Sequence, residues 1–143
     1  IDKQGNTLRV IDYKTGKVDA LTFNQIEDIF NSELGDKRPA YALQTMLYAW
    51  FYMREYGHTE GKRIVPYIAS LRSFYSDTPL RGLMVAEDKN LRQMDDYVAW
   101  NDQFETALRN FLEKELFAQD LRFKQVEDTQ VCEHCPFVDL CGR

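Results

Sequence analysis

An aspartate and a lysine stand two residues apart in the segment LRVIDYKTGK, Leu8 to Lys17. Its aliphatic residues are typical of a mostly buried strand, and Thr15-Gly16 predicts its end. Because side chains alternate across a strand, Asp12 and Lys14 project from one face. A carboxylate there suits a hard divalent cation, and the ammonium beside it can hold a water or a phosphate oxygen during phosphoryl transfer. From the spacing alone, an ordinary salt bridge on a half-exposed strand is the commoner alternative.

A glutamine and a tyrosine form a second polar pair, within a segment that otherwise predicts a buried helix. Pro39 suits a first helical turn, Ala40 to Tyr56 contains no Gly or Pro, and Gly57 is a natural C-terminal stop. Gln44 and Tyr48 are four residues apart and therefore share one helical face. A buried amide and phenol need polar partners. The pair is therefore either part of a site or a satisfied pair of core residues.

Three cysteines gather near the end of the chain with the spacing Cys132-x2-Cys135-x5-Cys141. An odd number of cysteines argues against a framework made only of disulfides. Thiolates at this spacing suit zinc, and His134 is a further candidate ligand, although its position next to Cys135 makes chelation of the same ion awkward. Three buried thiols without a metal are the remaining alternative.

The elements before the central helix are expected to present the first polar pair. Ile1 to Lys14 predicts a β-hairpin whose tight turn is Gln4-Gly5-Asn6. Thr15 to Arg38 is polar and irregular and predicts a loop that carries one short helix, for which Thr22 and Gln25 have capping-box spacing.

The elements after the central helix complete the expected fold. The helix is predicted to be largely buried against a sheet. Ile64 to Leu71 predicts an apolar strand, and a turn at Ser76 to Pro79 leads to a further strand at Leu80 to Ala86. From Met94 to Ala118, apolar residues recur at helical spacing and predict one long amphipathic helix whose aromatic residues belong to the core.

Two of these motifs carry a resemblance to a known family. The string VIDYKTGK resembles the (D/E)-x-K strand of the PD-(D/E)XK nuclease superfamily, in its RecB-like and AddB-like branch. QTMLY, Gln44 to Tyr48, resembles the Q-x-x-x-Y motif on the helix that follows. The resemblance covers roughly residues 1–71 and 132–141. It implies an α/β fold with a truncated restriction-endonuclease-like core of β-hairpin, helix and strand over 1–71. An elaboration with a C-terminal long helix would span 72–125, and a cysteine loop 126–143.

The same resemblance implies a function and roles for individual residues. The function would be Mg2+- or Mn2+-dependent phosphodiester hydrolysis of DNA, in a cytoplasmic exonuclease of DNA repair or recombination with a helicase subunit or domain as partner. Asp12 and the Tyr13 carbonyl would ligate the metal, and Lys14 would orient the attacking water. Gln44 and Tyr48 would shape the site.

The family places a further metal-binding aspartate on the strand before D-x-K. Asp2 best matches the last aspartate of the family's acidic-Arg-hydrophobic-Asp string, which would put the catalytic aspartate ahead of Ile1. Asp2 itself is the alternative ligand. Because the chain opens only a few residues before a strand, we expect a C-terminal piece of a longer nuclease that is inactive on its own.

The cysteine spacing resembles the closing part of the four-iron four-sulfur site of AddB-type and CRISPR-associated RecB-like nucleases. In those proteins a fourth cysteine lies far upstream, and this sequence has none there. A cluster of this type needs four thiolates. Cys132, Cys135 and Cys141 are therefore expected to hold the cluster in the full-length parent and not in this fragment.

Composition narrows the alternatives. A length of 143 residues and 44% hydrophobic content indicate one globular domain. The net charge of −5 argues against binding DNA through a broad basic field, although local basic residues such as Lys37, Arg38, Lys62 and Arg63 can still contact phosphates. No apolar run approaches the roughly 20 residues that span a bilayer. Two other classes remain: a non-catalytic DNA-binding or scaffolding module of the same fold, and a zinc-stapled interaction module.

Overall fold

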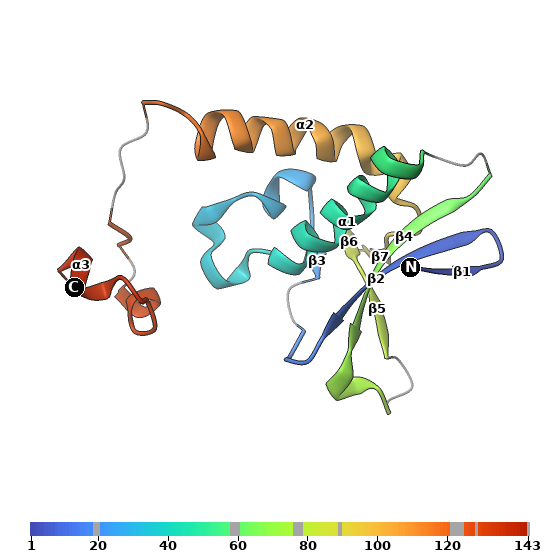
Figure 1. Cartoon of the computed structure of the whole chain (residues 1–143), viewed down its shortest axis with the longest axis horizontal. Helices are drawn as coiled ribbons and strands as arrows, with labels where there is room; N and C mark the ends of the chain where they lie inside the picture. Colours follow the sequence, from blue (N-terminus) through green and yellow to red (C-terminus); the bar gives the residue numbers. More distant parts are fainter. Residues whose placement is uncertain are drawn as a thin grey trace.

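The computed structural model describes residues 1–18, 21–57, 61–75, 79–88, 90–120, 125–127 and 129–142. Its strands form a four-stranded sheet and a three-stranded sheet, and helices cover one side of them (Figure 1). Both sheets and the helices contribute to one core, so the mixed α/β class predicted from the sequence is confirmed.

The four-stranded sheet holds the predicted hairpin and the strand after the central helix. β1 (Asp2–Gln4) and β2 (Thr7–Lys14) pair antiparallel, and Gly5 takes the positive φ of 57° that their tight turn requires. β4 (Arg63–Ser70) lies parallel to β2 over the full length of β2, and β5 (Leu80–Gly82) pairs antiparallel with β4. The order is β1-β2-β4-β5.

Helix α1 (Ala40–Tyr56) has the predicted bounds and connects the parallel strands β2 and β4. Its inner face buries Ala42, Thr45, Met46 and Ala49 against the sheet. The prediction of a largely buried helix holds for this face only. Aromatic residues elsewhere on the helix stay partly exposed: Tyr48 is 40% exposed, Phe51 57% and Tyr56 69%.

The three-stranded sheet contains strands that the sequence patterns did not predict. Its order is β3 (Thr22–Phe23), β6 (Met84–Glu87) and β7 (Asn90–Gln93). The single strand predicted for Leu80 to Ala86 is wrong, because the chain leaves the first sheet at the fully buried Leu83 and enters the second. Of the turn predicted for Ser76 to Pro79, all but Pro79 lies outside the described residues.

The connection between β2 and α1 carries two 3-10 turns, Ile26–Ile29 and Ser32–Lys37. The cap of the first turn differs from the predicted one. The Asp28 carboxylate accepts hydrogen bonds from the backbone N–H groups of Asn24 and Gln25, at 3.0 and 3.2 Å. Thr22 belongs instead to β3.

The long helix predicted from Met94 to Ala118 is shorter and irregular at both ends. Helix α2 spans Asn101–Phe111, preceded by a 3-10 turn at Tyr97–Trp100 and followed by a π turn at Leu112–Leu116. The Asp96 carboxylate caps the 3-10 turn, and it accepts hydrogen bonds from the backbone N–H groups of both Val98 and Ile64, each at 3.1 Å. Tyr97 and Phe104 are fully buried, so the predicted core role of these aromatic residues is confirmed.

The cysteine tail contains a 3-10 turn at Thr129–Cys132 and the short helix α3 (Val138–Cys141). In Figure 1 this tail lies apart from the two sheets. Within the described part of the chain, no helix has the length and apolar character needed to cross a membrane.

Candidate functional site

The predicted pair on β2 shares one face, as expected. Asp12 and Lys14 point to the side of the sheet that α1 covers, and their side chains are 12% and 21% exposed. The Lys14 Nζ lies 2.9 Å from the Asp12 Oδ2. Both residues sit at the carboxyl end of β2, where their partners across the parallel ladder are Ile68 and Ser70.

Helix α1 brings the second predicted pair to the first. The Lys14 ammonium donates to the Gln44 Oε1 at 2.6 Å, and the Gln44 Nε2 donates to the Tyr48 hydroxyl at 2.8 Å. The prediction that Gln44 and Tyr48 face the D-x-K strand is confirmed. Asp12, Lys14, Gln44 and Tyr48 therefore form one continuous polar chain from the strand to the helix.

A further residue of this cluster, Tyr41, was not predicted. The Lys14 Nζ lies 5.4 Å from the centroid of the Tyr41 ring, and the Tyr41 hydroxyl donates to the Lys17 carbonyl at 3.3 Å. Tyr41 stands one turn before Gln44, so helical spacing was a signal for it. Its ring therefore lies within cation–π distance of the ammonium.

The Asp12 carboxylate has a buried oxygen that fits a cation. Among the described atoms its Oδ2 has no hydrogen-bond partner, because Lys14 stands at ion-pair distance without the alignment of a hydrogen bond. A buried carboxylate oxygen is a strong ligand for a hard divalent ion. No group of three His, Cys, Asp or Glu side chains that could hold a metal occurs in the described residues. Mg2+ is often bound by one or two carboxylates with waters and substrate phosphates, so Asp12 with the predicted Tyr13 carbonyl fits that mode.

The structure does not bring Asp2 to this cluster. Asp2 lies opposite Arg9 in the β1–β2 ladder, and its carboxylate accepts from the Arg9 Nε at 3.1 Å and also pairs with the Nη2. This hydrogen bond raises the pKa of Arg9. Because Arg9 and Asp12 are an odd number of residues apart, Asp2 stands on the opposite face of the sheet from Asp12.

The cysteines remain separate thiols. Cys132 and Cys135 are partly buried and Cys141 is exposed, and all are free. The Cys135 N–H donates to the Cys132 carbonyl at 3.1 Å, which makes a tight turn of the backbone between them. With His134 included, the described tail shows no assembled metal site.

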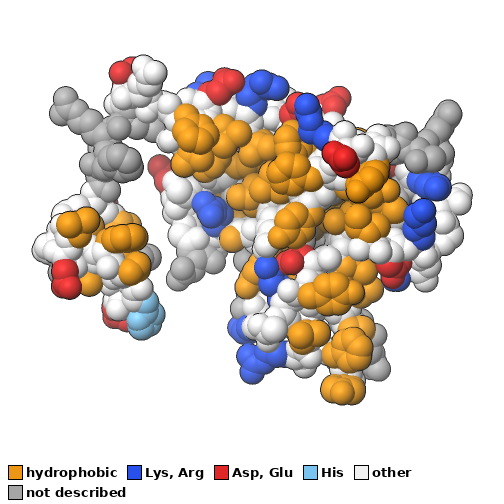
Figure 2. All heavy atoms as spheres, in the orientation of Figure 1, with side chains coloured by type: hydrophobic (Ala, Val, Ile, Leu, Met, Phe, Trp, Pro, Cys, Tyr) orange, Lys and Arg blue, Asp and Glu red, His pale blue; other side chains and the backbone are white. Residues whose placement is uncertain are grey.

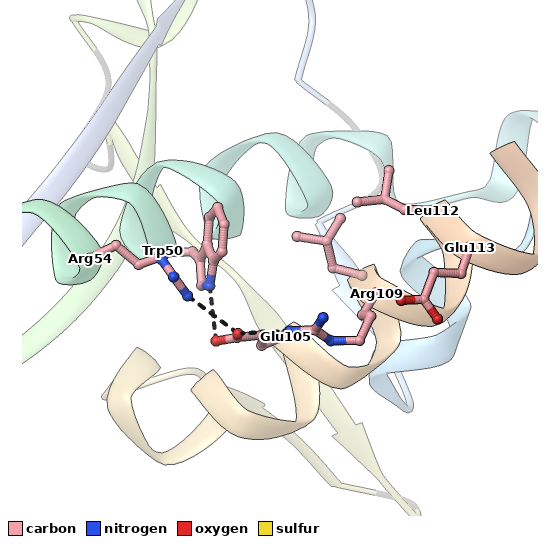
Figure 3. A pocket seen from close by; sticks show the side chains of 7 residues that line it. Trp50, Arg54, Glu105, Arg109, Leu112 and Glu113 are labelled. Atoms are coloured by element: carbon pink, nitrogen blue, oxygen red, sulfur yellow. Dashed lines mark hydrogen bonds and ion pairs between the residues drawn. The ribbon is translucent and has the colours of Figure 1, made fainter. Parts of the chain in front are cut away.

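A pocket of about 330 Å³ between α1 and α2 is distinct from the D-x-K cluster (Figure 3). Its centre is Glu105, which accepts from the Trp50 Nε1 and the Arg54 guanidinium, both at 3.3 Å, and lies 3.6 Å from Arg109. The Glu105 carboxylate is thus fully engaged with its neighbours. This arrangement braces the two helices against each other.

The parallel β2–α1–β4 unit and its polar chain define the class of the protein. A carboxylate, an ammonium and an amide meet at the carboxyl end of a parallel strand, in an α/β fold of the restriction-endonuclease type. The chain belongs to the PD-(D/E)XK nuclease superfamily, whose profile matches residues 1–142. No curated protein and no solved structure matches the chain. Members of this superfamily are typically nucleases that use divalent metals.

Proposed function

We propose that this chain provides the catalytic face of a Mg2+- or Mn2+-dependent nuclease that hydrolyses DNA phosphodiesters. One observation carries the proposal: the Lys14 ammonium is held between the Asp12 Oδ2 at 2.9 Å and the Gln44 Oε1 at 2.6 Å. A salt bridge with no further role would not need an amide from another element to fix the ammonium.

The contacts of Lys14 leave it N–H groups for substrate. A lysine ammonium has three N–H donors; the Gln44 Oε1 accepts one, and Asp12 lies at ion-pair distance without accepting a hydrogen bond on its Oδ2. A remaining N–H can hold the attacking water or a phosphate oxygen. Gln44 keeps the ammonium in place because its own amide is oriented by Tyr48.

Asp12 and the Tyr13 carbonyl would hold the metal ion. A bound divalent cation supplies Lewis-acid polarisation of the phosphate and lowers the pKa of a coordinated water. Lys14, which already pairs with Asp12, balances the negative charge that builds up on the phosphate beside that carboxylate.

The branch of the superfamily is a further part of the proposal. D-x-K followed by Q-x-x-x-Y, with a C-x2-C-x5-C tail, supports a RecB-like or AddB-like exonuclease of DNA repair or recombination that works with a helicase in the cytoplasm. In that setting Cys132, Cys135 and Cys141 supply thiolates to a four-iron four-sulfur cluster. Iron and acid-labile sulfide near four per chain in the full-length protein would support this assignment, and zinc in their place would support a structural zinc site instead.

The decisive experiment compares Asp12→Asn and Lys14→Ala in the protein that carries this domain. Cleavage of end-labelled DNA in Mg2+ should fall by at least about a hundredfold in each, which corresponds to about 2.7 kcal/mol of lost transition-state stabilisation. Asp12→Asn should weaken metal binding measured by calorimetry, whereas Lys14→Ala should leave it unchanged. Lys3→Ala, an exposed lysine on β1, is the matched control. Wild-type cleavage in both site variants would falsify the assignment.

A further inference from the structure

A second pocket, of about 360 Å³, opens at the carboxyl ends of β2 and β4. Basic and hydroxyl side chains line it together with one buried valine: Lys17, Val18, Ser70, Arg72, Ser73 and Arg81. None of these described lining residues is acidic. In a protein of net charge −5, this is a local concentration of positive charge.

The pocket lies on the same face of the sheet as the D-x-K cluster. Ser70 is the ladder partner of Lys14. Arg81 on β5 is the partner of Ile68, which is in turn the partner of Asp12, so Asp12 and Arg81 stand in one row across the sheet. Neighbouring strands are about 4.8 Å apart, which puts the backbones of these two residues roughly 10 Å apart. Lys17 follows Lys14 by three residues, at most about 10 Å of chain.

Hydrogen bonds anchor the Arg81 side chain and the Lys17 backbone, whereas Arg72 is exposed. The Arg81 Nη1 donates to the Val18 carbonyl at 2.6 Å, and Val18 belongs to the core. The backbone of Lys17 is tied to α1 through the Tyr41 hydroxyl. Arg72 is exposed on the 3-10 turn Leu71–Ser73 that follows β4 directly.

Two exposed aromatic rings follow Arg72. Phe74 is 60% exposed and Tyr75 99%, and their rings meet edge to face with centroids 5.8 Å apart. Rings this exposed contribute little to the core. In Figure 2, Lys and Arg side chains gather at the lower end of the molecule, beside a group of hydrophobic side chains. Charge that follows a backbone, next to rings on which bases stack, is how proteins bind single-stranded nucleic acid.

We propose that Lys17, Arg72 and Arg81 bind the phosphate next to the one that is cleaved, and that Phe74 and Tyr75 stack on the unpaired bases beyond it. This inference rests on the proposed function and deepens it, because it gives the substrate a direction across the sheet, from the D-x-K cluster toward β5. The ligand chemistry is the phosphodiester backbone of a single strand. An acidic peptide could pair with the cations, but it has no bases to stack on the two rings.

The test measures binding of a fluorescent oligothymidylate of about ten nucleotides, a length within the range of single-strand sites. Asp12→Asn is used as the background so that the oligonucleotide stays intact. The double variant Lys17→Gln with Arg72→Gln should weaken binding on the order of tenfold per lost phosphate contact at 50 mM salt. It should also make the fall of log K with log salt less steep by about 1.4, or about 0.7 for each of the two contacts. Phe74→Ala with Tyr75→Ala should weaken binding at least about fivefold with an unchanged slope.

The controls separate charge, fold and function. Lys3→Gln removes an exposed cation on β1 and should leave binding unchanged. Lys17→Arg with Arg72→Lys should keep the wild-type affinity and slope. Three results would overturn the inference. The first is an unchanged salt slope in the glutamine variant, and the second is no binding by the background protein. The third is equal competition by polyglutamate together with no effect of the ring variants.

The same experiments keep the two proposals apart. Normal cleavage with an unchanged salt slope would contradict the inference and leave the proposed function intact. Normal oligonucleotide binding without cleavage, in the protein that is otherwise wild type, would contradict the proposed function alone.

Discussion

Lys14 is held by Gln44, a residue with no chemical step of its own in the proposed reaction. Gln44 offers one oxygen to Lys14 and one N–H to Tyr48, so its amide has only one orientation that satisfies both contacts. This makes Gln44 a positioning residue. The difference between a residue that reacts and one that positions can be measured.

Gln44→Ala should lower kcat by about tenfold or more and leave KM for DNA within about twofold. The lost hydrogen bond to a charged group is worth about 1.5–3 kcal/mol, and it acts on the ammonium rather than on the substrate. Tyr48→Phe removes only the contact that orients the amide, so its effect on kcat should be smaller, about threefold to tenfold. A rise in KM without a change in kcat would mean that Gln44 binds substrate instead. Steady-state kinetics with a labelled oligonucleotide makes this distinction.

At the scale of single residues, the sequence predicted the two polar pairs of the cluster but not Tyr41. Asp12 with Lys14, and Gln44 with Tyr48, follow from the periods of a strand and a helix, which depend only on local geometry. Tyr41 was missed because an aromatic residue on a helix of apolar character looks like a core residue. Asp2 was a candidate by its motif, but pairing with Arg9 depends on the β1–β2 register, which the sequence does not determine uniquely.

Among the elements, the 3-10 turn before α2 contains an unusual buried phenol. Tyr97 is fully buried, and its hydroxyl has no hydrogen-bond partner among the described atoms. Burial, with a smaller effect of Glu105, raises its pKa well above the ordinary value. Its ring packs edge to face on Phe104, with centroids 6.0 Å apart. The ring therefore stabilises the core while the hydroxyl does not.

Tyr97→Phe should leave the free energy of unfolding unchanged or raise it by up to about 1 kcal/mol at pH 8, because it removes an unpaired buried hydroxyl and keeps the ring. Since the folded state keeps the proton longer than the unfolded state, the wild-type protein should lose stability as the pH rises above the ordinary tyrosine value of 10.0, by up to about 1.4 kcal/mol per pH unit. The variant should lack this part of the loss. Urea titrations at pH 8 and pH 11 test it, and parallel losses in both proteins would contradict it.

The passage from β5 to the second sheet leaves no room for a side chain at Gly82. A Cβ there would lie 2.6 Å from the Gln93 side chain, whose Nε2 donates to the Tyr67 hydroxyl at 3.0 Å. Gly82→Ala should therefore displace Gln93 and cost about 1–2 kcal/mol of stability. Adding Gln93→Ala should recover part of that loss, which a double-mutant cycle measures. Strictly additive losses would mean that Gln93 is not the obstacle.

Elements with local start and stop signals were predicted well. α1 has its predicted bounds because Pro39 and Gly57 act on the residues beside them. The change of sheet at Leu83 and the exposure of aromatic residues on α1 were not predictable, because both depend on which distant strand or helix is present to pair or to pack. The same limit applies to the 3-10 turn before α2, whose cap is the Asp96 carboxylate that also bonds Ile64 of β4.

For the whole molecule, metal binding should appear as stability. A ligand at ten times its dissociation constant adds about 1.4 kcal/mol, or roughly 3–6 °C in Tm for a domain of this size. Mg2+ or Mn2+ should raise Tm by about that amount in the wild-type protein and not in Asp12→Asn. Asp2→Asn should keep the shift, because the Asp2 carboxylate pairs with Arg9 on the other face of the sheet; loss of the shift would mean that Asp2 is a metal ligand. Differential scanning fluorimetry with Ca2+-free buffer and a chelator control distinguishes these outcomes.

The parallel pairing of β2 with β4 also sets an order of events in folding. Thr7 pairs with Arg63 and Lys14 with Ser70, so each rung joins residues that are far apart along the chain. Contacts of this kind form late and slowly compared with hairpins and isolated helices. Lys14 meets Gln44 only once α1 has docked on β2, so the chain becomes chemically competent only after a long-range contact has formed. A chain with β1–β2 and α1 each formed but undocked would contain every residue of the site at the wrong distance.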